Sequence, residues 1–322
     1  MGKRVGAVIG ALIAGVLVVG CTGNVGDSGG GGDSKKLVLI PGVADEPFYI
    51  SMQCGAEAKA KELGYRLDTQ APTEFDAAQQ TPILSGVVSN KPGGILIAPT
   101  HATAMASPMK QARDAGIKIV EVDTALDDTS VAQSSIASDN TKGGELAART
   151  LAQLIGDKGP VLVINTKAGT STTDARAQGF EAAVKAFPGI TSLGVQYNNN
   201  EAAQAASIVT ATLAAHPDLA GIFATNLSSA EGAATGLRNA GKLGQVKLVG
   251  FDASPKQVED LKAGTVQALI AQDPGGIGAQ GVEQAVAAIE GKPVTRTLRT
   301  DMVAITQTDL DANARYFYKR KC

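Results

Sequence analysis

The chain has 322 residues, with 29 Lys or Arg and 31 Asp or Glu, so its formal net charge is -2. No long basic run is present, which excludes nucleic acid as an expected partner, because such binding depends on a concentrated basic patch. Tryptophan is absent, and two His and three Cys leave little material for a metal or redox centre, so we expect neither a metal site nor a cofactor.

Residues 1–20 have the layout of a cleaved secretory signal. Lys3 and Arg4 precede an apolar run over 5–19 that is short for a membrane span. Cys21 directly follows a small glycine, as in a bacterial lipobox, where the cysteine receives a diacylglycerol and becomes the new N-terminus. The alternative is an ordinary secretory signal, with this cysteine free or disulfide-bonded. Residues 21–36, rich in Gly, Ser and Asp, predict a flexible tether.

Beyond the tether, apolar β-branched runs alternate with Ala-rich helical patterns, as in parallel strands covered by helices on both faces. The first round predicts strands near 37–40, 65–69, 94–98 and 118–122, with helices near 50–63, 77–89 and 104–115. A strand-like stretch, 133–137, comes next. The second round predicts strands near 159–164, 190–197, 220–224, 246–251 and 266–271, with helices near 173–186, 202–215, 228–240, 255–263 and 276–289. The sequence therefore predicts two similar, doubly wound α/β lobes.

Polar and aromatic side chains gather in the loops that follow these strands. In doubly wound sheets, ligands bind beyond the carboxyl ends of the strands. Aromatic rings that cover C–H surfaces, together with acid, amide and guanidinium groups that bond hydroxyls, are typical of a sugar site. The candidate ligand-binding residues are Glu46, Phe48, Tyr49, Asp123, Thr124, Arg176, Asn226, Asp252 and Gln272.

Several of these candidates have a plainer interpretation. Asp123 and Asp252 could be helix caps or turn formers after their strands. Phe48 and Tyr49 could be core residues at a helix entrance. Arg176 lies deep in a helical pattern, where spacing alone favours a solvated side chain.

The remaining His and Cys residues suggest structural roles. His101 and His216 are isolated, and neither is expected to bind metal. If Cys21 carries lipid, Cys54 and Cys322 are left in an oxidising compartment, where a disulfide is permitted. We expect these two cysteines to pair.

Six dispersed motifs, all in order, resemble the type I periplasmic binding proteins and, within them, the ribose-binding group. They are Pro47-Phe48-Tyr49, Ile136–Asn140, Ala168–Ser171 with Gly179-Phe180, Ala215–Asp218, Val249–Asp252 and Ile270–Gln272. The resemblance covers residue 37 to about residue 291. It implies two lobes joined by three crossing segments, near 138–140, 270–272 and 298–300.

The same resemblance implies how the chain divides between the lobes. Residues 37–138 and 271–299 would form the first lobe, and residues 139–270 and 300–305 the second. The tail, 306–322, extends past the resemblance. From its amphipathic pattern over 310–318 we hypothesise that it packs across the hinge and brings Cys322 towards Cys54.

Carried over by motif, the resemblance implies that Phe48 and Tyr49 clamp a sugar ring and that Asp123 accepts from its hydroxyls. The second lobe would contribute Arg176, Asn226 and Asp252, with Gln272 beside the hinge. The chain departs from the ribose binder at three places, where Glu46 replaces Asn, Thr124 replaces Arg, and Asn200 or a neighbour in 198–200 replaces an aromatic residue. These departures favour another pentose, a hexose or an acyclic polyol.

The N-terminal segment predicts an extracytoplasmic lipoprotein, and the resemblance implies a monomer that binds a small sugar or polyol by hinge closure and delivers it to an ABC permease. It would be held at the cell membrane through Cys21, and it would not be an enzyme. A receptor that presents its ligand to a sensor or chemotaxis partner is the main alternative. A LacI-like transcription factor is disfavoured by the secretion signal, and an enzyme by the lack of a nucleophile elbow or phosphate loop.

Overall fold

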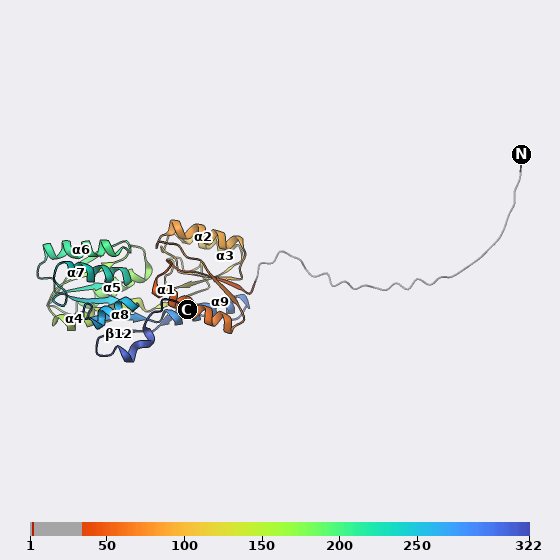
Figure 1. The fold of residues 1–322 in the computed structure, drawn as a ribbon. Coiled ribbons are helices and arrows are strands. Elements are labelled where there is room, and N and C mark those ends of the chain that lie inside the picture. The colour runs from red at the N-terminus through yellow and green to blue at the C-terminus, as the bar shows by residue number, and fades with distance from the viewer. Residues whose placement is uncertain (1, 3–33) are drawn as a thin grey trace. The chain divides into compact units, whose positions relative to one another are not determined.

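The computed structural model describes Gly2 and residues 34–322. The expected signal segment, the lipidated Cys21 and most of the expected tether lie outside the described residues. From Ser34 onward the chain forms two six-stranded sheets, each covered by helices on both faces (Figure 1). The predicted pair of doubly wound lobes is confirmed.

The first sheet is entirely parallel, in the order β11-β5-β4-β3-β1-β2. Its strands are β1 Lys36–Ile40, β2 Arg66–Thr69, β3 Gly94–Ile97, β4 Lys118–Val122, β5 Ser134–Ser138 and β11 Thr297–Thr300. One face is covered by α1 Pro47–Glu62 and α9 Pro274–Ile289, and the other by α2 Ala77–Ser89 and α3 Ala106–Asp114 (Figure 1). Every residue of β3 is buried, as a strand covered on both faces requires.

The second sheet has the order β12-β10-β9-β8-β6-β7, with β12 the antiparallel edge. Its strands are β6 Gly159–Asn165, β7 Ile190–Tyr197, β8 Gly221–Ala224, β9 Lys247–Phe251, β10 Ala268–Gln272 and β12 Met302–Ile305. One face is covered by α4 Asn140–Ile155 and α5 Ser171–Val184. The other is covered by α6 Ala202–Ala215, α7 Leu227–Asn239 and α8 Pro255–Lys262.

Helix α4 was not among the predicted elements, nor were strands β11 and β12. Gly143 and Gly144 weaken the helical pattern of α4, because glycine is a poor helix former. Their role is tertiary: a Cβ on Gly144 would lie 2.0 Å from the backbone oxygen of Arg176, so glycine lets α4 pack directly on α5. Helix α1 begins at Pro47, three residues before the predicted start, since proline is favoured in the first helical turn.

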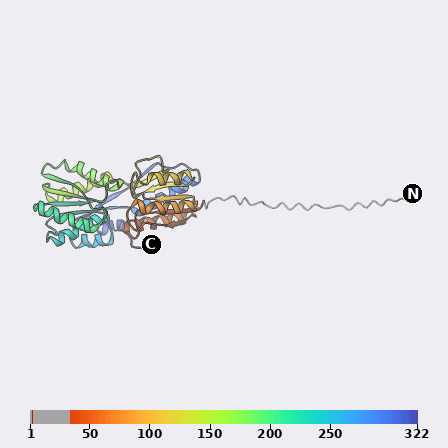
Figure 2. The same ribbon diagram turned by 90° about the horizontal axis from the view of Figure 1, so that it is seen from above.

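The chain passes between the two sheets three times, after β5, after β10 and after β11 (Figure 2). The second and third crossings come about two residues later than predicted. Hydrogen bonds tie the three crossings together: the Ser138 hydroxyl donates to Gln272 Oε1 at 2.8 Å and lies 3.2 Å from Thr300 Oγ1. The segments that join the lobes therefore form one connected hinge.

Beyond β12 the chain continues through a 3-10 helix, η1 Asp311–Tyr316, to a disulfide between Cys322 and Cys54 of α1. Within the described residues, none of the helices has the length and apolar character needed to cross a membrane. The same residues hold no cluster of three or more His, Cys, Asp or Glu side chains suited to a metal ion.

Candidate functional site

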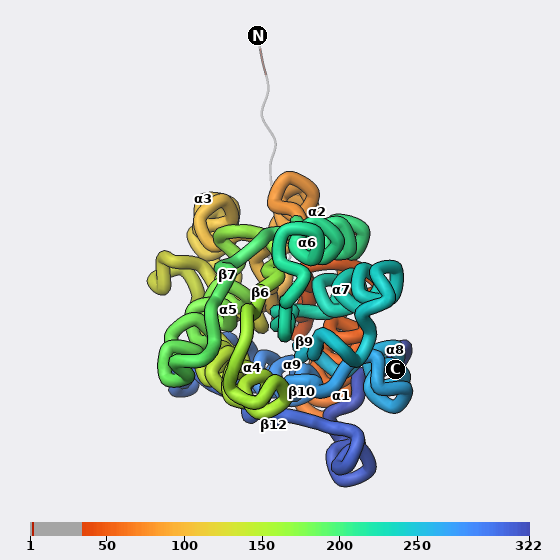
Figure 3. Tube along the Cα trace, turned by 90° about the vertical axis from the view of Figure 1, so that its left-hand side faces the viewer, coloured from red at the N-terminus to blue at the C-terminus, as the bar shows by residue number. Residues whose placement is uncertain are grey.

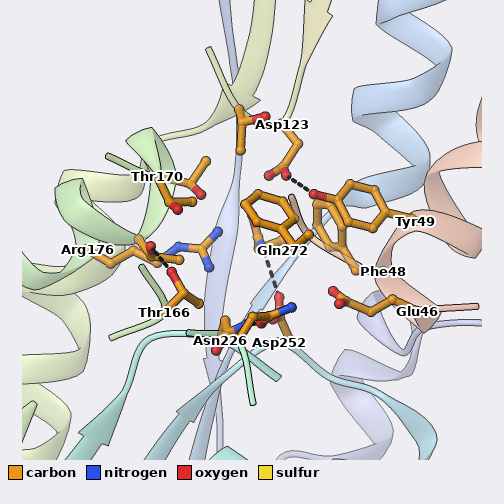
Figure 4. A pocket seen from close by; sticks show the side chains of 15 residues that line it. Glu46, Phe48, Tyr49, Asp123, Thr166, Thr170, Arg176, Asn226, Asp252 and Gln272 are labelled. Atoms are coloured by element: carbon orange, nitrogen blue, oxygen red, sulfur yellow. Dashed lines mark hydrogen bonds between the residues drawn. The ribbon is translucent and has the colours of Figure 1, made fainter. Parts of the chain in front are cut away.

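A pocket lies between the lobes, at the carboxyl ends of their parallel strands (Figure 4). The empty space in and around it, open solvent at the mouth included, is about 400 Å³. All nine candidates from the sequence line it. Six further residues complete the lining: Phe75, Thr166, Thr170, Thr172, Thr173 and Asn200.

The two lobes place an aspartate at equivalent positions. Asp123 directly follows β4 and Asp252 directly follows β9, and both have a left-handed backbone, with φ of 68° and 80°. Each backbone N–H donates at 2.8 Å to the neighbouring strand, to the carbonyls of Ile136 and Ile270. A left-handed non-glycine residue costs on the order of 1 kcal/mol, and such strain concentrates at functional sites.

The helix-cap interpretation of these two aspartates is wrong. Strand β5 follows Asp123, so no helix begins there. Helix α8, which follows Asp252, is capped by Ser254, whose hydroxyl accepts from Gln257 N in a capping box. Asp252 instead accepts from the first N–H of a different helix, Leu227 N of α7, at 3.1 Å. Both carboxylates are held at the pocket rather than at their own next helix.

Helix α1 brings two aromatic rings to the first-lobe wall. The rings of Phe48 and Tyr49 meet edge to face, with centroids 5.2 Å apart. Both are buried in the apolar core, as their plainer interpretation predicts, and both also line the pocket. The Tyr49 hydroxyl donates to Asp123 Oδ2 at 2.9 Å, which orients that carboxylate (Figure 4).

Arg176 is the cation of the site, and the plainer interpretation of it as a solvated side chain is wrong, since it is only 3% exposed. Helical side chains lean towards the helix N-terminus, and α5 begins at Ser171 beside the cleft. Its Nε donates to Asn140 Oδ1 and its Nη1 to the Thr225 carbonyl, both at 2.8 Å. The guanidinium carbon lies 3.7 Å from the Phe251 ring centroid. These contacts aim the guanidinium into the pocket (Figure 4).

The second-lobe wall also holds a fixed acid and a fixed amide. Asp252 Oδ1 accepts from Gln272 Nε2 at 2.7 Å, and Gln272 is the residue that bonds Ser138 in the hinge. Asn226 caps α7 by accepting from Ser229 N at 3.1 Å, while its amide donates to Asn200 Oδ1 at 2.7 Å. Hinge and binding wall are therefore part of one hydrogen-bond network.

Burial and like charge shift the acids of the pocket towards their neutral forms. Burial, reinforced by Asp252, Asp123 and Glu231, raises the pKa of Glu46 to about 8, against the opposing charge of Arg176. Burial raises the pKa of Asp123 to about 6, although Arg176 and Tyr49 lower it. Near neutral pH the Glu46 carboxyl is thus a hydrogen-bond donor as well as an acceptor, which suits an uncharged, hydroxyl-rich ligand.

Two hydroxyls in the pocket lack partners. Thr124 Oγ1 and Thr170 Oγ1 are buried and make no hydrogen bond within the described part of the chain. Buried polar atoms are nearly always bonded, and an unsatisfied one indicates a missing partner. Both residues line the pocket, so a polar ligand would satisfy them.

Residues 37–293 match the periplasmic binding protein domain family. The chain belongs to this family. Among curated relatives, it is 32% identical to the ribose import binding protein of Salmonella typhimurium, over 83% of this chain and 88% of that protein. It is 30% identical to the D-allose-binding periplasmic protein of Escherichia coli, over 78% and 83% of the two chains.

Solved structures of other proteins have the same fold as this periplasmic binding protein. An ABC transporter solute-binding protein from Agrobacterium vitis, bound to α-D-tagatopyranose, is 43% identical with a TM-score of 0.87, over 88% of this chain and 99% of that one. A second, from the same organism with bound D-fucose, is 28% identical with a TM-score of 0.84, over 88% and 100%. The type I fold implied by the sequence motifs is confirmed.

Four lining residues of this periplasmic binding protein were missed from its sequence: Phe75, Thr166, Thr172 and Thr173. A usable signal existed for two of them, because Phe75 lies in the loop between β2 and α2 and Thr166 directly follows β6. Both lie in loops that follow strands, the places from which the other candidates were chosen. Thr172 and Thr173 lie in the first turn of α5, where nothing in the sequence distinguishes them.

Proposed function

We propose that this periplasmic binding protein is the solute-binding component of an ABC importer, that its solute is a monosaccharide, and that it catalyses no reaction. The observation that carries the proposal is the pocket between the lobes. Aromatic rings, one buried cation, three carboxyl groups and two hydroxyls that have no partner among the described residues converge there, as in a site for a small polar ligand. The relatives support it, since they are named for ribose and allose.

D-tagatose is the first ligand to test, because the Agrobacterium vitis protein that is 43% identical holds it as a pyranose. We expect the mature domain to bind one sugar of a panel of D-tagatose, D-ribose, D-allose, D-arabinose and D-fucose with a dissociation constant of micromolar order, about 8 kcal/mol. A thermal-shift screen followed by calorimetry checks this, because a ligand that binds the folded state raises its stability. A panel that includes polyols and yields no hit would contradict the sugar assignment.

We infer that the ligand is captured when the two lobes close about the hinge. The first lobe comprises residues 37–138 and 271–299, and the second comprises residues 139–270 and 300–305. Contacts across the mouth of the pocket support this. Ala102 N donates to the Gly169 carbonyl at 3.0 Å, and Ala125 N donates to Ser171 Oγ at 2.9 Å. Because each lobe holds only part of the binding residues, the ligand favours the arrangement that brings them together.

Gly169 offers a test of closure. Its φ is +85°, and a Cβ there would lie 3.0 Å from the ring of His101 on the other lobe. Gly169→Ala is therefore expected to weaken sugar binding about three- to tenfold, through backbone strain and a clash that arises only when the lobes meet. Calorimetry measures the change.

Gly194→Ala is the matched control for that variant. Gly194 has the same φ of +85°, but a Cβ there would have no neighbour within 4 Å. Gly194→Ala introduces the same backbone strain but no contact between the lobes. The sugar affinity of this variant should therefore stay at the wild-type value. Equal losses of affinity in the two variants would contradict a closure contact at Gly169.

We propose further that the protein is a monomeric, extracytoplasmic lipoprotein anchored to the cell membrane through Cys21. The support is the sequence alone: a basic, then apolar segment that ends at Gly20-Cys21, followed by a stretch with little to bury. A single acyl chain binds membranes weakly, so the two chains of a diacylglycerol suit a stable anchor. Mass spectrometry of the mature N-terminus tests the proposal, and an unmodified Cys21 would refute it.

A further inference from the structure

The C-terminal tail runs from the second lobe to the first. It leaves β12 of the second sheet, and the Tyr318 N–H then donates to the Ala253 carbonyl, still in the second lobe, at 2.9 Å. One residue later, Lys319 N donates to Ser51 Oγ of α1 at 2.7 Å, and Cys322 is bonded to Cys54 of the same helix. Figure 3 shows the C-terminus beside α1 and α8.

Tyr318 carries the tail to the binding site. Its side chain is 4% exposed, and its hydroxyl donates to Asp252 Oδ1 at 2.9 Å. Gln272 N donates to the same hydroxyl at 3.4 Å. Its ring meets the edge of the Phe48 ring, with centroids 5.7 Å apart. Tyr318 thus contacts three residues that line the pocket without lining it itself.

We propose that Tyr318 is a positioning residue of the sugar site, and that residues 306–322 form a strap across the hinge, fastened to α1 by the Cys54–Cys322 disulfide. The proposal rests on the proposed function. It concerns a segment beyond residues 37–293, the part of the chain that matches the family.

The geometry explains how the strap acts on Asp252. One oxygen of this carboxylate accepts from two donors, Gln272 of the second crossing and Tyr318 of the tail, while the other accepts from Leu227 N. Tyr318 therefore sets which way the carboxylate faces. Leu310 and Tyr318 also belong to the same buried apolar cluster as Phe48 of the first lobe, so the strap packs against both lobes at once.

The disulfide gives the strap its hold on the first lobe. Downstream of Tyr318, the hydrogen bond of Lys319 and the covalent bond of Cys322 join the tail to α1, the helix that carries Phe48 and Tyr49. Movement of α1 away from the second lobe therefore pulls on the tail. The strap restricts the opening of the lobes and holds Phe48, Tyr49 and Asp252 at the distances that sugar binding requires.

Tyr318→Phe tests the positioning role, because it removes the hydroxyl and keeps the ring against Phe48. Calorimetry with D-tagatose, or with whichever panel sugar the wild type binds, is expected to show about tenfold weaker binding with little change in the unfolding midpoint of the sugar-free protein. Combined with Asp252→Asn, the loss from Tyr318→Phe should largely disappear, because coupled residues are not additive. Tyr316→Phe is the control and should bind as the wild type does, because among the described residues the Tyr316 hydroxyl bonds only Arg315.

Cys322→Ser tests the fastening. We expect several-fold weaker binding through faster dissociation, the same loss in wild-type protein treated with reductant, and no effect of reductant on the variant. If the variant folds poorly, treatment of the wild-type protein with reductant still tests the role of the disulfide.

Unchanged affinity in Tyr318→Phe, or full additivity with Asp252→Asn, would overturn the positioning role. Unchanged affinity after reduction would overturn the strap. A wild type that binds no panel sugar would overturn the proposed function itself.

Discussion

Replacing Arg176 with methionine is expected to weaken sugar binding at least about 100-fold. Charge-assisted hydrogen bonds contribute roughly 1.5–3 kcal/mol each, and the guanidinium has donors for more than one. Two of its N–H groups serve the protein, through Asn140 and the Thr225 carbonyl. The others find no partner within the described residues and face the pocket, where a sugar hydroxyl or ring oxygen would accept from them (Figure 4).

The same substitution is expected to lower the free energy of unfolding of the sugar-free protein by about 3 kcal/mol, because removing one partner of a buried charge cluster leaves the others uncompensated. Asp123 and Glu46 would lose the cation that lowers their pKa. Calorimetry and chemical denaturation measure the two effects. Arg176→Lys keeps the positive charge but loses the planar guanidinium with its paired N–H donors. Relative to Arg176→Met, it should therefore restore the free energy of unfolding more fully than the sugar affinity.

Arg149→Met is the matched control, since Arg149 lies on the exposed face of α4 and pairs with Glu145 alone in the described part of the chain, at 3.6 Å. Exposed pairs of this kind contribute little, so both affinity and stability should remain near the wild-type values. A folded Arg176→Met protein that binds the sugar within threefold of the wild type would show that the guanidinium makes no contact with the ligand.

Raising the pH from 6 to 8 is expected to destabilise the wild-type protein relative to Glu46→Gln. The folded-state pKa of Glu46, about 8, exceeds its ordinary value of 4.5, so the folded protein holds this proton more tightly than the unfolded chain. The resulting stability is fully present below pH 4.5 and is lost as the pH rises to about 8. Because Glu46 is partly exposed, we discount for solvent screening and expect a change of roughly 1–2 kcal/mol.

The comparison with Glu46→Gln isolates Glu46 from its neighbour, because both proteins carry Asp123. The pKa of Asp123 is raised to about 6, so Asp123 is half protonated at pH 6 and loses the rest of its proton in both proteins as the pH rises. Denaturation curves at pH 6, 7 and 8 for the wild type, Glu46→Gln and Glu259→Gln measure the effect, with the exposed Glu259 as the control. A constant difference between the wild type and Glu46→Gln across these pH values would exclude a Glu46 carboxyl that is protonated at pH 6.

Much of the site could be predicted from the sequence because its geometry depends on local order. A polar residue at the end of a strand of a parallel sheet, or just after it, must lie at the carboxyl edge of that sheet, whatever the rest of the fold does. Asp123, Asn226, Asp252 and Gln272 were predicted in this way, and all four line the pocket. Thr166 directly follows β6 and obeys the same rule, whereas Phe75 lies farther along the loop after β2.

Other features depend on contacts between distant segments, which no local pattern records. Helix α4 was missed because the glycines that let it pack on α5 also weaken its helical signal. Arg176 looks solvated from its spacing, yet its side chain leans back along α5 to meet Asn140 and the end of β8. The pKa of Glu46 rises because burial and carboxylates from both lobes act on it together.

By itself, the sequence determined the two α/β lobes, ten of their twelve strands and the polar edge that lines the pocket. These features depend on the periodicity of apolar residues and on the residue types at the end of each strand. Only the tertiary structure decided that the edges of the two sheets share one pocket, that Arg176 faces its acids, and that Tyr318 reaches Asp252. Those features require segments up to 268 residues apart, such as Cys54 and Cys322, to meet in space.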